Sequence, residues 1–206
     1  MPGNIDKAQF FVNGVDTKTK GLDIVLAWKK TINENHFSAT LVGNINDMKI
    51  DKVKNGTLDE KTFFGERDKA FLLASAPPSK FGLNLNYARK WFDAGLAFTR
   101  FSDVKLLDYQ MDEDPEDYRT SPDETDEQVF ANQKKAATDT YGAKIVTDLT
   151  LGFKLSKSTK ISIGANNLFN IYPDQQDDWV EAGGYWDAVQ MGFSGAYYYA
   201  RLGFNF

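Results

Sequence analysis

Hydrophobic and polar residues alternate with a period of two along most of this chain, a pattern typical of β-strands. The clearest example is 81–87, whose odd positions are apolar and whose even positions are Gly, Asn and Asn. A sheet that separates two different environments produces this alternation. Eight strands are predicted on this basis, at 5–13, 18–30, 36–50, 81–87, 92–99, 144–155, 161–166 and 187–206.

The predicted connections are of two kinds. Short turns are expected at Asn13-Gly14, Asn33 to Asn35, Arg89-Lys90 and Ser156 to Ser158. Long polar loops are expected at 51–79, 108–139 and 172–188. From Asn33 onward short and long connections alternate, so they would lie at opposite ends of the strands, as in a transmembrane barrel. The predicted fold is therefore all-β, with antiparallel transmembrane β-barrel strands in a meander.

The closing stretch changes phase. Val189, Met191 and Phe193 are its upstream apolar residues, and their parity is opposite to that of the downstream apolar residues. We expect a bulge or bend near Gly195-Ala196, or an upper part that stands clear of the membrane.

A half-buried strand of a soluble β-sandwich would also alternate, so further features must decide the class. The polar rows hold mostly Asn, Ser, Thr, Gly and Asp, not the Lys and Glu of a water-facing surface. The apolar rows carry no charge at the depth where Arg or Lys would cost about 2–4 kcal/mol in lipid. The mean hydropathy of -0.46 does not oppose a barrel, because half of each strand faces water. These features favour the membrane barrel.

Composition excludes several functions. The net charge of -5 argues against nucleic-acid partners, which require a basic face. Without cysteine the chain cannot form a cysteine zinc site, and its single histidine, His36, makes a histidine-built metal site or a histidine-dependent triad hard to assemble. We expect no catalytic residue, no metal and no cofactor. The first residues show no signal-peptide pattern, so we expect the start of the gene product to lie outside this sequence.

Two segments resemble the closing part of TonB-dependent outer-membrane receptors, most closely those of Bacteroidetes-type bacteria. The first is Thr147 to Leu151 (TDLTL) followed by Ile161 to Pro173 (ISIGANNLFNIYP). The second is the terminal stretch Tyr197 to Phe206 (YYYARLGFNF). Thr19 to Asp23, after Asn13-Gly14, is similar to a hairpin of the same family.

The resemblance implies a barrel of about 22 strands with a plug folded inside. Residues 1–206 would be the C-terminal part of the barrel, without the plug domain and the N-terminal strands. It also implies a Gram-negative cell outer membrane and transport of a siderophore, cobalamin or glycan energised by TonB, with no catalysis. The implied partners are lipid, the remaining strands and plug, TonB through the missing N-terminal part, and the outer-membrane assembly machinery. An assembly signature is implied at Tyr198, Ala200, Leu202, Phe204 and Phe206.

Two other readings stay open. About eight strands can close around their own side chains, so the chain could be a self-contained outer-membrane protein with a structural or adhesive role. A barrel enzyme is the third reading, although one histidine leaves little from which to build an active site.

Three groups of polar or aromatic residues are candidate sites. Trp179, Tyr185 and Trp186 could stack on a ring-shaped ligand or anchor the barrel at the membrane interface. An acidic segment at 112–127 could attract cations, but its spacing fits no calcium loop and predicts a solvated, mobile loop. Charged residues on the inner rows are expected to form lumen-facing salt bridges or plug contacts: Asp23, Asp93, Asp148, Lys29, Lys154 and Arg201.

Overall fold

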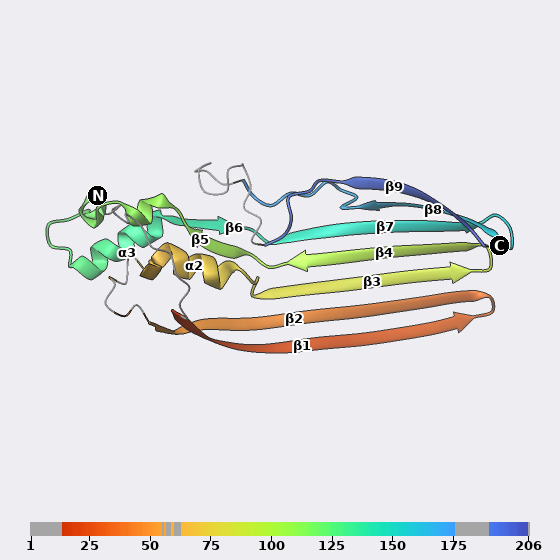
Figure 1. Cartoon of the computed structure of the whole chain (residues 1–206), viewed down its shortest axis with the longest axis horizontal. Helices are drawn as coiled ribbons and strands as arrows, with labels where there is room; N and C mark the ends of the chain where they lie inside the picture. The colour runs from red at the N-terminus through yellow and green to blue at the C-terminus, as the bar shows by residue number, and fades with distance from the viewer. Residues whose placement is uncertain (1–13, 55, 57–58, 60–62, 176–189, 206) are drawn as a thin grey trace, which may run out of the picture.

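Seven antiparallel strands form one sheet in a simple meander, drawn in Figure 1. The computed structural model describes residues 14–54, 56, 59, 63–175 and 190–205. The sheet order is β1-β2-β3-β4-β7-β8-β9, and β1 and β9 lie at its two edges. The strands are β1 Val15–Ile32, β2 Asn35–Val53, β3 Ser79–Arg89, β4 Phe92–Phe101, β7 Lys144–Lys154, β8 Thr159–Asn166 and β9 Tyr197–Phe204.

Tight turns and large excursions lie at opposite ends of the sheet, as predicted (Figure 1). Asn33 and Glu34 join β1 to β2, and the φ of 54° at Asn33 belongs to the left-handed region that asparagine tolerates in hairpin turns. Lys90 and Trp91 join β3 to β4, while residues 155–158 join β7 to β8. The strands therefore present only short turns on one side.

The strand register confirms that the two faces are chemically different. On one face Leu41 lies opposite Leu83, and Leu83 lies opposite Phe98. On the other face Thr40 lies opposite Asn84, and Asn84 lies opposite Ala97. The same parity continues through β7, β8 and β9, so one apolar and one largely polar face extend across the whole sheet.

β1 and β2 are longer than a membrane requires. They contain 18 and 19 residues, whereas a tilted transmembrane strand needs about 9–11. Their excess length projects from the end that carries the excursions (Figure 1). There Lys18 pairs with Asp51 at 2.6 Å and Lys54 pairs with Asp16 at 2.7 Å. Charged side chains of this kind suit water, so the projecting hairpin lies outside the apolar layer.

Two segments predicted as loops are folded. The 51–79 loop contains the helix α2, and the acidic segment contains two 3-10 helices and the helix α3. A second, two-stranded sheet, β5-β6, continues beyond β4 and β7. We call these elements together the platform. They are α2 Glu66–Ala74, β5 Val104–Leu107, η1 Tyr109–Asp112, η2 Pro115–Tyr118, α3 Asp126–Ala136 and β6 Thr138–Tyr141.

The platform has its own small core. Ala74 of α2 packs with Val104 and Leu106 of β5 and with Tyr141 of β6, and all four side chains are buried. Val129 and Gln133 of α3 are the most completely enclosed large side chains of the described chain. No described helix is both long enough and apolar enough to span a membrane.

The closing strand is shorter than predicted. β9 begins at Tyr197, whereas the pattern predicted a strand from 187. Residues 190–196 are not in a strand, and Met191 is buried, so the phase change near Gly195-Ala196 marks the start of the strand and not a bulge within it. The strand predicted at 5–13 lies outside the described residues.

Candidate functional site

Most of the apolar face of the sheet is uncovered, although Thr147 on β7 and Ala165 on β8 are buried. Its side chains remain exposed although they are large: Leu202 is 58% exposed and Trp28 is 53% exposed. Burial of the outward leucines and phenylalanines under a second layer would have contradicted the membrane interpretation. Leu85 and Phe204 are exposed, Leu83, Leu149 and Leu151 are partly exposed, and Phe206 lies outside the described residues. A soluble protein rarely exposes so continuous an apolar surface. The exposed large side chains on the apolar face of the strands are Leu22, Leu26, Trp28, Ile32, Phe37, Ile45, Leu85, Ile145, Ile163, Tyr198, Leu202 and Phe204.

A row of aromatic rings bounds this face beside the tight turns. The ring centroids of Phe37 and Tyr87 are 5.2 Å apart, those of Tyr87 and Phe92 are 6.0 Å apart, and those of Phe92 and Phe153 are 5.2 Å apart. The row therefore crosses β2, β3, β4 and β7 without a gap. Aromatic girdles of this kind mark the membrane interface of outer-membrane barrels.

Charged residues limit the apolar face at the platform end. Lys20 lies opposite Asp47, and the outward Arg100 lies opposite Phe81 and Ile145. Between these charges and the aromatic row, the outward positions of the described strands are apolar apart from Thr147. An apolar band with polar borders on both sides is what a bilayer requires of a barrel wall.

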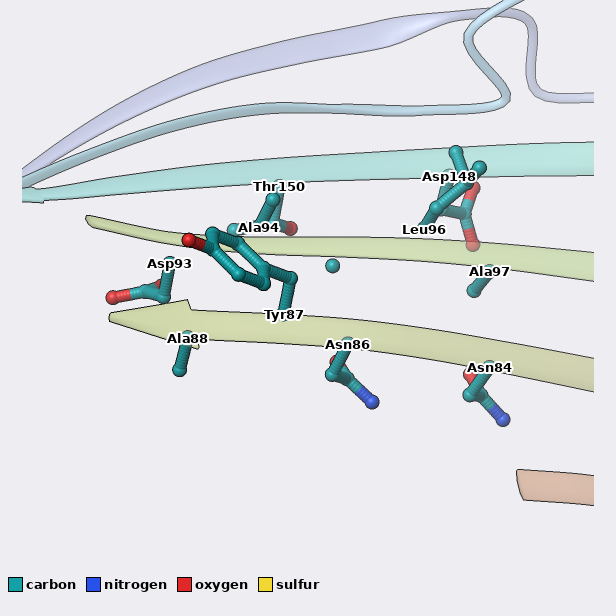
Figure 2. Close-up of a pocket in the computed structure, with 11 residues that line it drawn as sticks. Asn84, Asn86, Tyr87, Ala88, Asp93, Ala94, Leu96, Ala97, Asp148 and Thr150 are labelled. Atoms are coloured by element: carbon teal, nitrogen blue, oxygen red, sulfur yellow. The ribbon is translucent and has the colours of Figure 1, made fainter. Parts of the chain in front are cut away.

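The opposite face carries a hollow of about 420 Å³ over β3, β4 and β7 (Figure 2). Polar groups line it: the amides of Asn84 and Asn86, the carboxylates of Asp93 and Asp148, and the hydroxyl of Thr150. Such a surface offers hydrogen-bond donors and acceptors to water or to another polypeptide. The two sides of the wall therefore face two different environments.

Glycines allow side chains to cross neighbouring strands on the polar face. Tyr199 of β9 lies directly over Gly164 of β8, where a Cβ would clash with the ring. Its hydroxyl is 2.7 Å from the Thr150 hydroxyl on β7, and the Arg201 guanidinium lies 4.6 Å from the centroid of its ring. The side chain thus connects the last three strands.

The Asn-Leu-Phe segment, residues 167–169, begins a turn after β8 that the Asn167 side chain closes by hydrogen bonds. Asn167 has a φ of 51° and is only 6% exposed. Its side-chain amide donates to the Ile171 carbonyl at 2.7 Å, and its side-chain oxygen accepts from the Ile171 N–H at 2.8 Å. Its own backbone N–H donates to the Asp148 carboxylate at 2.7 Å. Asn170 in turn accepts from the Ala196 N–H at 2.8 Å, which attaches the chain entering β9.

The geometry of this wall agrees with the comparison to protein families. A model of the TonB dependent receptor-like β-barrel matches residues 2–168, which is most of the chain. The chain belongs to that family. It is a family of outer-membrane transport receptors and not of enzymes. A comparison with curated proteins gave no match.

The platform of this receptor-family barrel is held by buried and charged contacts. Gln133 of α3 donates to the carbonyls of Gln110 and Glu113, at 2.8 and 3.0 Å. Arg67 of α2 lies 4.0 Å from the centroid of the Tyr109 ring and pairs with Asp112. These contacts join α2, η1 and α3 into one unit.

The acidic segment is largely exposed to solvent, as predicted, but it is folded into helical turns held by hydrogen bonds and is not a loop throughout. Arg119 pairs with Glu116 at 2.7 Å and with Asp126 at 3.3 Å. The hydroxyl and the backbone N–H of Thr120 donate to Glu124 and hold its pKa at about 2. Among the described residues, no three acidic or histidine side chains gather closely enough to hold a metal ion.

A second pKa shift in the segment has a single main cause. The Tyr118 hydroxyl donates to the Glu113 carboxylate, and this bond raises the pKa of Tyr118 to about 12. The phenol therefore remains protonated throughout the physiological range.

The inner-row charges are only partly paired as predicted. Asp93 forms a salt bridge with Lys160 at 2.7 Å, whereas Asp23 accepts a hydrogen bond from Asn44 at 2.6 Å. The Asp148 carboxylate accepts the hydrogen bond from the Asn167 N–H described above. For Lys29 and Lys154 the described chain shows no ion pair. His36 is 3.1 Å from the Thr31 hydroxyl beside the first turn, as an ordinary polar residue would be.

Two anchors beside the last excursion were not foreseen. Asp174 accepts from the Gly142 N–H at 2.6 Å and pairs with Lys144, whose hydrogen bond lowers the pKa of Asp174. Gln190, only 4% exposed, donates to the Gly142 carbonyl at 3.0 Å and to the Ser102 carbonyl. Both anchors meet at Gly142, although more than thirty residues of sequence separate them from it, so no local pattern could have indicated them.

The remaining predicted site residues stand as follows. Tyr198, Ala200, Leu202 and Phe204 share the apolar face of β9, opposite Ala165, Ile163, Ile161 and Thr159 respectively. Phe206 lies outside the described residues, as do the three aromatic residues at positions 179, 185 and 186.

Proposed function

We propose that this chain supplies barrel wall and exterior platform to an outer-membrane receptor that takes up a scarce nutrient with energy delivered by TonB. The single observation that carries the proposal is the wall itself: an uncovered apolar face with an aromatic border, and a polar face behind it. Such a wall fits lipid on one side and a lumen on the other. The family membership supports the receptor role.

The edges of the sheet support a place within a larger barrel. β1 pairs only with β2, and β9 only with β8, among the described strands. Backbone groups left unpaired in hydrocarbon cost several kcal/mol each, about 4–8 on a cyclohexane reference. We therefore propose that both edges pair with further strands of a barrel of about 22, and that a plug contacts the polar face.

The remaining roles complete the proposal. Trp179, Tyr185 and Trp186 would contact the ligand, which would be a siderophore, cobalamin or glycan, because aromatic rings stack on flat or ring-shaped ligands. Tyr198, Ala200, Leu202, Phe204 and Phe206 would be read by the outer-membrane assembly machinery as the closing strand. TonB would act through a part of the receptor other than this wall.

Uptake in the host bacterium tests the receptor role. The complete gene is deleted, and uptake of labelled ferric siderophores, cobalamin and oligosaccharides is compared with the parent strain and with a strain lacking TonB. We expect one ligand class to be lost equally in both mutants. Normal uptake of every ligand in the deletion strain would refute the proposal.

Cysteine cross-linking distinguishes the self-contained barrel. The chain has no native cysteine, so one cysteine introduced into β9 and one at 5–13, the first strand predicted from the sequence, report whether the chain closes on itself. In a larger barrel these two cysteines form no disulfide with each other, because further strands lie between them. A disulfide between them would instead support a small closed barrel with a structural or adhesive role.

A further inference from the structure

A groove of about 460 Å³ opens on the platform between α2, β5 and the projecting end of β2. Its floor is apolar and includes Val104 and Leu106, both buried, together with Leu73 and Ile50. Its volume falls within the range of about 300–1,000 Å³ that is typical of small-molecule sites. The groove lies on a different part of the fold from the hollow of Figure 2, which is on the polar face of the wall.

The charge of the groove is opposite to that of the whole chain. Three lysines, Lys69, Lys105 and Lys134, and one glutamate, Glu66, line it, an excess of two positive charges. The chain as a whole carries -5. An apolar floor with a positive rim is complementary to a molecule with an apolar body and an anionic head.

The cations are held in place beside the floor. Glu66 uses one carboxylate oxygen to bind the Lys69 ammonium at 3.0 Å and the other to bind the Lys134 ammonium at 2.9 Å. This clamp joins α2 to α3 across the groove. An ammonium has three N–H donors, so the bond from Lys134 to Glu66 does not exhaust its capacity for an incoming anion. The Lys134 side chain is 47% exposed and can be reached from solution.

We propose that this groove binds a small amphipathic carboxylate, with its alkyl or aryl body against Leu73 and Ile50 above the buried Val104 and Leu106, and its carboxylate beside Lys134. This inference rests on the proposed receptor role, in which the platform faces the exterior. It adds a ligand class and a binding position that the wall geometry alone does not provide.

Calorimetry on the complete receptor in phosphatidylcholine nanodiscs tests the inference. The probe is 4-phenylbutyrate, and 4-phenylbutanol is the neutral control of similar shape. We expect saturable heat from the carboxylate and much weaker binding of the alcohol. Lys134→Met should weaken binding of the carboxylate at least about tenfold, because a hydrogen bond to a charged group is lost. Lys135→Met, on the adjacent position outside the groove, should bind as the parent does.

A second variant covers the risk that Lys134→Met disturbs the platform by freeing Glu66. Ala70→Trp fills the groove without altering charge, and it should abolish the saturable heat. Equal binding by Lys134→Met and Lys135→Met would overturn the inference. So would a lack of saturable heat in the parent, which would mean that the chain itself or lipid fills the groove. Normal nutrient uptake with no probe binding would reject the groove site alone, whereas probe binding without any uptake would reject the receptor role alone.

Discussion

The carboxylate of Asp93 on β4 lies 2.7 Å from the ammonium of Lys160 on β8, although β7 runs between the two strands. Gly152 makes this contact possible. It lies opposite Asp93 on β7, and a Cβ at this glycine would overlap the Asp93 carboxylate. The absence of one side chain thus allows an ion pair to bridge three strands on the polar face.

Replacing this glycine should weaken the wall. In Gly152→Ala the new methyl group displaces Asp93 and breaks its contact with Lys160, so we expect the unfolding free energy to fall by about 1–3 kcal/mol. Urea unfolding in phospholipid vesicles, followed by tryptophan fluorescence, measures the change. Gly203→Ala is the matched control, because a Cβ at this polar-face glycine meets nothing closer than 3.9 Å. An equal loss of unfolding free energy in both variants would show that any glycine replacement weakens the strands, and that the Asp93–Lys160 contact over Gly152 contributes nothing specific.

A charge on the apolar face should be costly, whereas the same charge one residue away should be tolerated. Leu83 faces outward and Asn84 faces the hollow. We expect Leu83→Arg to lower stability by about 2–4 kcal/mol in a bilayer, and Asn84→Arg to change it by less than about 1 kcal/mol. The same vesicle assay compares the two variants. A larger loss of stability for Asn84→Arg than for Leu83→Arg would contradict the assignment of the Leu83 face to lipid.

Loss of the Asn167 side chain should release the turn after β8. Asn167→Ala removes two hydrogen bonds to Ile171 and places alanine at a positive φ, so we expect a cost of about 1–3 kcal/mol. Asn167→Gly keeps the backbone conformation and should recover part of that loss. Asn166→Ala, at an exposed neighbouring position, should be nearly neutral. If alanine and glycine were equally harmful, the backbone conformation would contribute nothing.

The depressed pKa of Glu124 gives the platform a pH dependence. Because the carboxylate is bonded mainly by Thr120 and has a pKa of about 2, below the ordinary 4.5, its contribution is fully present above about pH 4.5 and is lost as the pH falls to 2. We expect Glu124→Gln to speed hydrogen exchange of residues 120–132 at pH 7, and the difference from the parent to shrink near pH 2. Glu127→Gln, which is exposed on α3, is the control. An unchanged difference across this pH range would contradict the assignment.

The strands could be predicted because their signal is local. The alternation of Leu83 and Asn84 recurs along the seven-stranded sheet, and the side-chain period of two assigns each residue to a face before its neighbouring strand is known. The platform helices of the acidic segment were not predicted, because the run of acidic residues at 112–127 is typical of a solvated loop. A capping signature was present there: Thr125 and Gln128 bond reciprocally at the start of α3, with the Thr125 N–H at 2.8 Å from the Gln128 side chain.

The functional contacts of the wall could not be predicted in the same way. Asp93 and Lys160 are far apart in sequence, and their contact depends on a glycine in a third strand. Gln190 donates to the carbonyls of Ser102, between β4 and β5, and of Tyr141, at the end of β6. Such contacts follow from the register of several strands at once, which single-sequence patterns do not specify.

The two chain segments that lead into and out of the platform are each interrupted, and the two breaks lie beside each other in the strand register. β4 ends at Phe101 and β5 begins at Val104, while β6 ends at Tyr141 and β7 begins at Lys144. The hydrogen-bond ladder below the break does not depend on the ladder above it. We therefore expect β4 and β7 to keep their register when residues 102–143 are shortened, although α2, Asp174 and Gln190 would then lose the partners that they contact there.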